Sequence, residues 1–256
     1  MVSFAPEDLS RDAFLRGRMW LYQPKSGYRS GLDPVLLAAA APVLPGQSVL
    51  DLGCGVGAAA LCLLARVPGA RAVGLEIQPA YHELALRNAA ENGVDFRPVL
   101  GDVADGARAL QGENFDHVIA NPPYYRAGAH TRASDAGRQT ALGEALPLAE
   151  WIATAARRLK PRGFFHMIQR ADRLPDMLAG CAGRLGALEL LPLAARPGRA
   201  PELVILRARK DGRAPFRLHA PLVLHSDDRS LGNGKNYSPA IAAVQADAAP
   251  LPWPEA

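Results

Sequence analysis

The sequence predicts an α/β domain built on a doubly wound, mainly parallel sheet of seven strands. Short apolar runs alternate with helical segments over the first two thirds of the chain, an alternation typical of parallel sheets that helices cover on both faces. One run, residues 48–52, leads through a glycine turn at 53–57 directly into an alanine-rich helix. With 256 residues the chain is long enough to bury one core of ordinary size.

Apolar runs bounded by turn residues locate the seven strands. They are predicted at residues 48–52, 72–76, 96–100, 115–120, 164–168, 188–191 and 203–207. A turn is expected at 160–163, and one more strand within 216–224. Doubly wound sheets bind ligands at the carboxyl ends of their strands, so the residues that end these strands are site candidates.

Capping and breaking residues locate the helices. Asp33 is expected as an N-cap with Pro34 at the first helical position, and Pro79 opens another helix that Gly93 closes. The predicted helices are 33–41, 58–64, 80–91, 147–159 and 174–185.

Three regions are expected along the chain. They are a basic and aromatic N-terminal arm at 1–30, the main domain at 31–245 and a loose C-terminal tail at 246–256. Basic residues interleaved with aromatics can bind nucleic acid through phosphate contacts and base stacking. An arm packed on the domain with its charges in water explains the same residues, and both interpretations stay open.

Composition is that of a soluble globular protein without metal or membrane signals. The chain is 49% hydrophobic with a mean hydropathy of −0.03, and its net charge of +4 is compatible with a nucleic-acid substrate. Its three cysteines form neither a disulfide framework nor a metal cluster, and the six histidines are scattered. Without a signal segment or an apolar run that could span a bilayer, a cytoplasmic protein is expected.

A glycine turn marks the first candidate site. The spacing Gly53-x-Gly55-x-Gly57 follows Asp51 and differs from the G-x-G-x-x-G of dinucleotide sites. Glycines let backbone approach a ligand, and the N-terminus of the next helix favours a carboxylate or phosphate. Close strand–helix packing is the plainer explanation of the glycines. With Asp51 in front, the turn resembles motif I of class I S-adenosylmethionine-dependent methyltransferases.

Two further acidic residues end neighbouring strands. Glu76 lies about twenty residues beyond the glycines, where a carboxylate commonly accepts from both ribose hydroxyls of a nucleoside cofactor. Asp102 follows the third strand and suits a cofactor's adenine amine, or the N-cap of a helix from Val103 onward, or both. Asp51, Glu76, Asp102 and Asn121 are therefore expected at one edge of one sheet.

The fourth strand delivers the segment Asn121-Pro122-Pro123-Tyr124, which suits methyl transfer to a planar amine. Such a nitrogen is a poor nucleophile because its lone pair is delocalised. Two acceptors aimed at its hydrogens, the Asn121 side-chain carbonyl and the Pro122 backbone carbonyl, favour the pyramidal geometry that transfer requires. Tyr124 offers a flat face for an extruded base. The alternative is a strand-ending turn with Tyr124 in the core.

Together these motifs resemble class I, Rossmann-like N-methyltransferases of the Asn-Pro-Pro-Tyr type, and most of all the bacterial tRNA(Val) adenine-N6 methyltransferase family. The helix at 33–37 directly before the glycine turn, the doubled tyrosine at 124–125 and the segment at 236–238 carry the closer resemblance. The resemblance implies S-adenosylmethionine as cofactor and adenine N6 of tRNA as target. It covers roughly residues 20–240 and is weakest after Pro192.

The resemblance also implies roles for individual residues. Asp51, Gly53 and Gly55 would hold the methionine part of the cofactor, Glu76 its ribose and Asp102 its adenine. The target base would be held by Asn121, Pro122 and Tyr124. Further substrate candidates, mainly for phosphate contacts, are Arg29, Tyr125, Arg126, Arg132, Arg138 and Lys235.

Other functions fit the same motifs less fully. Protein glutamine N5-methyltransferases use Asn-Pro-Pro-Tyr on an amide nitrogen, but usually carry a helical N-terminal domain for which the first thirty residues leave no room. Guanine-N2 methylation of ribosomal RNA more often goes with a longer chain and a phenylalanine after the prolines. A DNA adenine methyltransferase, a nucleotide-dependent oxidoreductase and a non-catalytic RNA-binding relative are further alternatives.

Overall fold

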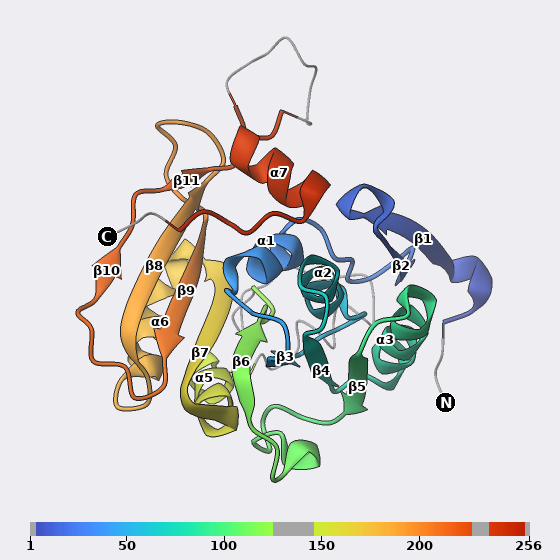
Figure 1. Ribbon diagram of the computed structural model, residues 1–256, viewed down its shortest axis with the longest axis horizontal. Helices are drawn as coiled ribbons and strands as arrows, with labels where there is room; N and C mark the ends of the chain where they lie inside the picture. The colour runs from blue at the N-terminus through green and yellow to red at the C-terminus, as the bar shows by residue number, and fades with distance from the viewer. Residues whose placement is uncertain (1–3, 125–145, 227–235, 254–256) are drawn as a thin grey trace.

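The fold rests on one nine-stranded sheet, seen in Figure 1. The computed structural model describes residues 4–124, 146–226 and 236–253. The sheet order is β10-β8-β9-β7-β6-β3-β4-β5, with β11 pairing β8. Its seven long strands are β3 (Ser48–Leu52), β4 (Arg71–Glu76), β5 (Phe96–Leu100), β6 (Phe115–Ala120), β7 (Leu159–Arg170), β8 (Gly186–Ala194) and β9 (Leu203–Arg209).

The sheet is mainly parallel, as predicted. Strands β5, β4, β3, β6 and β7 run parallel to one another, whereas β9 is antiparallel to both of its neighbours, β7 and β8. In place of one strand within 216–224, two strands of two residues each, β10 (Arg217–Leu218) and β11 (Leu222–Val223), pair with β8. The α/β doubly wound prediction is confirmed.

Alternation along β3 divides the core into two layers. Val49 packs in one cluster with α1 (Asp33–Ala40), α2 (Ala58–Arg66), α3 (Pro79–Asn92) and α7 (Pro239–Asp247). Leu50 and Leu52 pack in a second cluster with α5 (Leu148–Arg158) and α6 (Leu174–Cys181). Because successive side chains of a strand point to opposite faces, the two clusters lie on the two sides of the sheet. Figure 1 shows the helices arranged on both sides.

Four local predictions differ from the structure. Residue 33 begins α1 but makes no capping hydrogen bond, since its carboxylate accepts from a tyrosine across the site described below. No α-helix follows Asp102; turns and the short 3-10 helix η3 (Arg108–Leu110) take its place. Helix α6 ends at Cys181, before Gly183 with its φ of +70°. The expected turn at 160–163 is an irregularity within β7, where the register against β6 shifts.

The N-terminal region forms a separate hairpin of β1 (Leu9–Phe14) and β2 (Met19–Pro24), with the 3-10 helices η1 (Pro6–Asp8) before β1 and η2 (Leu15–Gly17) between the strands. Two asparagines one helical turn apart on α3 hold it. Asn88 accepts from the Tyr22 N–H at 2.7 Å and donates to the Tyr22 carbonyl at 3.1 Å. Asn92 makes the same pair of hydrogen bonds with Trp20, at 2.9 and 2.8 Å. These amides satisfy the backbone of β2 as a neighbouring strand would.

The C-terminal segment crosses the end of α1. The Leu251 N–H donates to the Ala39 carbonyl at 2.8 Å, and the Trp253 indole donates to the Ala40 carbonyl at 3.0 Å. Leu251 is buried, and the Arg207 guanidinium lies 4.1 Å from the centroid of the Trp253 ring. Residues 248–253, expected as part of a loose tail, therefore make these contacts with the domain. No helix of the described residues is long and apolar enough to cross a membrane.

Two buried histidines lie next to each other in the sheet. His117 on β6 and His166 on β7 stack with ring centroids 5.9 Å apart. His117 contacts the Gln47 side-chain oxygen at 3.1 Å, whereas neither ring nitrogen of His166 has a hydrogen-bond partner among the described residues. Burial lowers the pKa of His117 to about 4 and that of His166 well below its usual range. Both imidazoles are therefore neutral in the folded protein at neutral pH.

We expect the free energy of unfolding to fall as the pH is lowered from about 6.5 to 4. In that window the unfolded chain binds protons at both histidines, whereas the folded protein does not. A pKa change from 6.5 to about 4 at His117 alone corresponds to roughly 3 kcal/mol. Urea denaturation at a series of pH values measures the slope. His117→Asn and His166→Leu should each flatten it; slopes equal to that of the wild type in both variants would contradict the assignment.

Candidate active site

A cavity of about 920 Å³ opens at the carboxyl ends of β3, β4, β5 and β6. Its volume is at the large end for small-molecule sites. Every described residue predicted for cofactor or target lines it, namely Asp51, Gly53, Gly55, Glu76, Asp102, Asn121, Pro122 and Tyr124. The structure therefore brings these eight residues together, as expected for the ends of neighbouring parallel strands.

The glycine turn requires glycine for two different reasons. Gly53 and Gly55 have φ values of +66° and +56°, which L side chains rarely adopt. A Cβ on Gly53 would also come within 2.6 Å of the Trp151 ring on α5. A Cβ on Gly55 would meet nothing closer than 3.9 Å, where Tyr28 lies. Gly53 thus allows close packing, while Gly55 leaves open space facing the cavity.

Glu76 connects the glycine turn to the neighbouring strand. Its carboxylate accepts from the Gly55 N–H at 2.9 Å and from the Gln78 N–H at 2.8 Å. The residue is 5% exposed, and burial raises its pKa despite these hydrogen bonds. A carboxylate offers about four acceptor sites, so the group can still accept from a hydroxyl of a ligand beside its backbone donors.

Asp51 is the second buried carboxylate of the cavity. It is 2% exposed, and one of its oxygens accepts from the Ala60 N–H of α2 at 3.3 Å. Burial, with a smaller contribution from the nearby Glu76 charge, raises its pKa to about 7. Two such carboxylates facing one cavity favour a ligand that brings positive charge and hydroxyl donors. The sulfonium, ammonium and ribose groups of S-adenosylmethionine fit this requirement.

Asp102 is less buried than the other two carboxylates. One carboxylate oxygen accepts from the Ala104 N–H at 2.8 Å, so the side chain closes a local turn instead of capping a helix. The Gly101 N–H before it donates to the Glu76 carbonyl at 2.9 Å, which joins the ends of β4 and β5.

The segment after β6 is held from two sides. The Tyr124 hydroxyl donates to the Asp33 carboxylate at 2.6 Å, and burial together with that carboxylate raises the pKa of Tyr124. The fully buried Gln169 amide donates to the Pro122 carbonyl at 3.3 Å and to the Pro123 carbonyl at 3.5 Å. Asn121 lines the cavity and makes no hydrogen bond to another described side chain.

Several residues of the site were not predicted from the sequence as site residues. The sequence predicts Asp33 as a helix cap and places Tyr28 in the basic and aromatic arm, whose two interpretations stay open, yet both residues line the cavity. Trp151 and Gln169 lie in ordinary helix and strand patterns, so only the fold brings them to the site.

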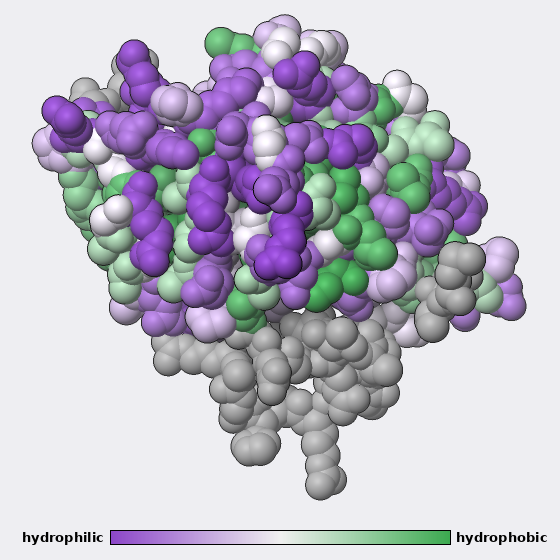
Figure 2. All heavy atoms as spheres, turned by 90° about the horizontal axis from the view of Figure 1, so that it is seen from below, coloured by the Kyte–Doolittle hydropathy of each residue, from purple (hydrophilic) through white to green (hydrophobic). Residues whose placement is uncertain are grey.

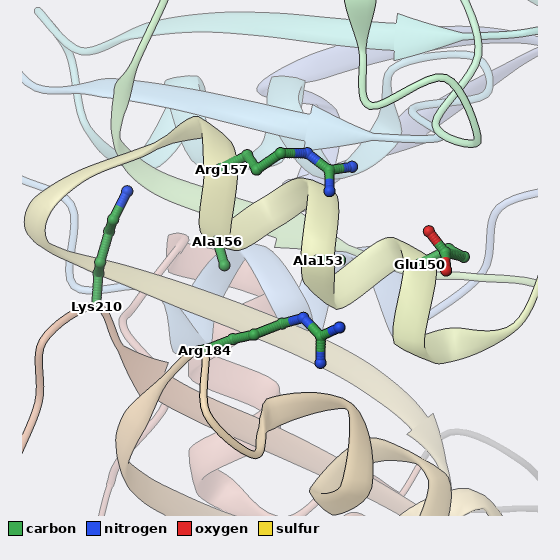
Figure 3. Close-up of a pocket in the computed structure, with 6 residues that line it drawn as sticks. All are labelled: Glu150, Ala153, Ala156, Arg157, Arg184 and Lys210. Carbon is green, nitrogen blue, oxygen red and sulfur yellow. The ribbon is translucent and has the colours of Figure 1, made fainter.

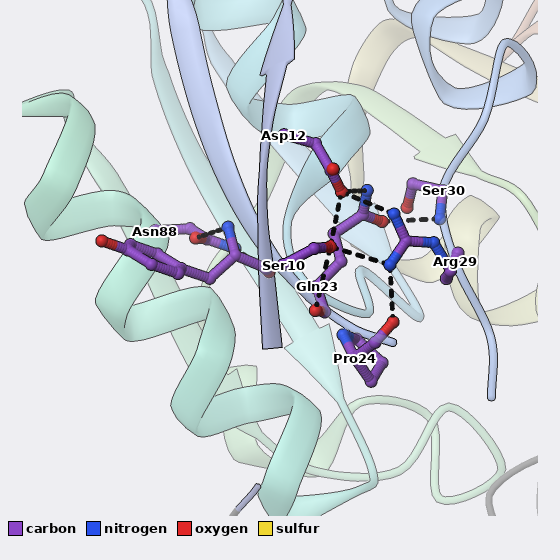
Figure 4. A network of polar contacts seen from close by, with 8 residues as sticks. Ser10, Asp12, Gln23, Pro24, Arg29, Ser30 and Asn88 are labelled. Atoms are coloured by element: carbon purple, nitrogen blue, oxygen red, sulfur yellow. Dashed lines mark hydrogen bonds and ion pairs between the residues drawn. The ribbon is translucent and has the colours of Figure 1, made fainter. Parts of the chain in front are cut away.

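Arg29 lines the cavity but points its guanidinium at the hairpin, as Figure 4 shows. It donates to the Ser10 hydroxyl and the Pro24 carbonyl, both at 2.8 Å, and pairs with Asp12 at 2.7 Å. The remaining substrate candidates, Tyr125, Arg126, Arg132, Arg138 and Lys235, lie outside the described residues. Within the described ranges, no group of three or more His, Cys, Asp or Glu side chains is arranged to hold a metal ion.

Comparison with known proteins agrees with this geometry. Residues 33–185 match the family described as the methyltransferase small domain. A tRNA1(Val) (adenine(37)-N6)-methyltransferase of Porphyromonas gingivalis is 34% identical over 204 residues, 76% of this chain and 79% of that protein. A release factor glutamine methyltransferase of Rhodospirillum rubrum is 42% identical over 100 residues, 36% of this chain and 30% of that protein. A solved structure, described as a predicted O-methyltransferase from Agrobacterium tumefaciens, has a TM-score of 0.67 at 27% identity and covers 83% of this chain and 94% of that one.

Cofactor affinity should depend on pH through Asp51. Because the pKa of Asp51 is about 7, we expect the affinity for S-adenosylmethionine to fall at lower pH, by at most about tenfold per unit. Asp51→Asn should weaken binding and reduce this pH dependence. Titration calorimetry between pH 6 and 8 measures both. An Asp51→Asn protein with the wild-type pH profile would contradict the role.

Proposed function

Because the chain belongs to the methyltransferase small-domain family, and within it to the family of the tRNA1(Val) (adenine(37)-N6)-methyltransferases, we propose that it methylates N6 of adenine 37 in a valine tRNA. The observation that carries the proposal is that Asn121, Pro122 and Tyr124 line the same cavity as the buried carboxylates Asp51 and Glu76. A cofactor site and an amine-binding motif thus share one space.

S-adenosylmethionine is the cofactor, and when bound it supplies an electrophilic methyl group on a sulfonium sulfur. The Asp51 carboxylate would attract its positive charge, and Glu76 would accept from its ribose hydroxyls. Gly55 keeps a side chain out of the space that the methionine part requires, and Gly53 lets the turn pack closely on Trp151. In the free protein both carboxylates have raised pKa values, so binding a cation relieves part of the cost of their burial.

The residues after β6 would orient the target amine. The Asn121 and Pro122 carbonyl oxygens would accept its two hydrogens, which turns the nitrogen lone pair out of the ring plane and towards the methyl group. Tyr124 would stack against the base, and its hydroxyl is anchored on Asp33. The bound cofactor would supply the methyl group, with its C–S bond breaking as the N–C bond forms, and the amine proton would leave afterwards to water. No general base is needed before transfer.

The amine-binding carbonyl is itself held in place. Gln169 donates to the Pro122 and Pro123 carbonyls, and its own side-chain oxygen accepts from the Arg170 N–H at 2.9 Å. Gln169 would therefore act as a positioning residue, because it limits the directions in which the Pro122 carbonyl can point.

The extent of the matches favours tRNA over a protein amide. The glutamine methyltransferase match spans 100 residues, about the size of a shared cofactor-binding core, whereas the tRNA methyltransferase match spans 204. Two acceptors for amine hydrogens also favour nitrogen over oxygen as the target, since a hydroxyl has only one hydrogen to donate. A tRNA substrate would place the enzyme in the cytoplasm.

Labelled S-adenosylmethionine and a cell extract test the substrate class directly. We expect label in tRNA, recovered as N6-methyladenosine when the nucleosides are identified by mass, and mapped to position 37 of valine tRNA. Label that resists nuclease but is lost with protease would instead identify a protein amide and overturn the proposal.

Asn121→Ala should reduce methyl transfer by about a thousandfold or more while cofactor binding stays within twofold. The change removes an acceptor that would act on the amine and leaves Asp51 and Glu76, the residues assigned to the cofactor, in place. Single-turnover kinetics and titration calorimetry measure the two properties. Parallel loss of cofactor binding in this variant would contradict the role of Asn121.

Gln169→Met should lower kcat roughly tenfold with little effect on the KM for either substrate. The methionine keeps the buried volume but cannot donate to the Pro122 carbonyl, so that carbonyl is no longer fixed. Ser48→Ala is a matched control, since it removes another buried hydrogen bond, to Asp116, at the opposite end of β3. An equal loss of kcat in both variants would point to general destabilisation instead.

A further inference from the structure

A second, shallower pocket lies on the outer side of α5, away from the cavity. It has a volume of about 430 Å³ and is lined by Glu150, Ala153, Ala156, Arg157, Arg184 and Lys210. Figure 3 shows the Arg157 and Arg184 side chains extending on either side of α5 towards its Glu150 end, with Lys210 beside the last turn. The three cations come from α5, from the turn after α6 and from the end of β9.

Neutral acceptors hold the three cations in place. The Lys210 ammonium donates to the Leu159 carbonyl at 2.8 Å, and the Arg184 guanidinium to the Gly180 carbonyl at 3.3 Å. Arg157 donates to the Thr154 hydroxyl at 2.7 Å. These contacts fix positions without cancelling charge, and each group keeps further N–H donors for a ligand.

The pocket's cations differ from other basic residues nearby. Lys160 pairs with Asp116 at 2.9 Å, and Arg173 pairs with Asp176 at 2.8 Å. By contrast, the three cations of the pocket have no ion pair within 4.0 Å to a carboxylate of the described residues. Glu150 lies at the far end of the pocket from Lys210 (Figure 3), so the pocket carries net positive charge.

Helix α5 connects this pocket to the active site. Trp151 in its first turns lines the cavity, and Arg157 follows six residues later, a rise of about 9 Å along the helix axis. The cavity and the pocket therefore both have lining residues on α5.

We propose that Arg157, Arg184 and Lys210 bind backbone phosphates of the RNA substrate, an assignment that rests on the proposed function. Three cations spread around α5 fit successive phosphates better than a single small anion, and the arginine forks suit phosphate oxygens. The surface seen in Figure 2 is mostly hydrophilic, and α5 lies in the lower part of Figure 1, the side from which that view is taken. Contacts to phosphates add affinity without reading sequence.

The test compares the full-length Arg184→Ala/Lys210→Ala variant with wild type on valine tRNA. We expect KM for tRNA to rise roughly tenfold, with kcat at saturating tRNA and S-adenosylmethionine affinity both within twofold. The slope of log Kd for tRNA against log salt should shrink by about 1.5, because each lost phosphate contact removes about 0.7–0.9. Arg184→Lys/Lys210→Arg, which keeps both charges, should retain most of the affinity.

Arg71→Ala/Arg97→Ala is the matched control, because it removes two positive charges from β4 and β5 at the other edge of the sheet. It should leave the KM and the salt slope near wild type. An active wild type whose pocket variant keeps both values would overturn this assignment alone. A wild type that methylates no tRNA would overturn the proposed function, and this assignment with it.

Discussion

The hydrogen bond from the Gly55 N–H to the Glu76 carboxylate holds together the elements on which the candidate site depends. It joins the turn after β3 to the end of β4, and the Gly101 N–H adds the end of β5 through the Glu76 carbonyl. Three strand ends are thus tied to one residue. The positive φ of Gly55 allows the turn to present its N–H to Glu76 while its missing side chain leaves the cavity open.

The same site contains two buried carboxylates, which are unfavourable for the stability of the free protein. Asp51 and Glu76 are both nearly inaccessible to water, burial raises the pKa of each carboxyl, and the Glu76 charge adds to the raised pKa of Asp51. A fold selected for stability alone would place apolar residues there. The two carboxylates lower the stability of the free protein. Binding of a cationic ligand that neutralises them would raise it again. The free protein therefore already has the carboxylates of the cavity arranged to bind a cationic ligand.

Sequence reasoning succeeded where short-range rules decide and failed where distant residues meet. Strands 96–100 and 115–120 are apolar runs between turn residues, and the structure has the same bounds. Asp33 looked like a helix cap because its local pattern is that of one, but the Tyr124 hydroxyl, ninety-one positions away, takes its carboxylate. Gln169 gave no signal, since a buried glutamine at a strand end has meaning only beside the carbonyl it contacts. Roles of the substrate candidates outside the described residues stay predictions.

The two asparagines of α3 that hold the hairpin make the site sensitive to deamidation. Asn92 donates its amide to Trp20 and is followed by Gly93, and asparagine is a thermolabile residue. Deamidation would leave a carboxylate that can accept from the Trp20 N–H but cannot donate to its carbonyl. The β2 strand would lose that support, and β2 leads directly into residues 27–31, which line the cavity. Loss of the Asn92 amide would thereby weaken the support of cavity-lining residues 27–31.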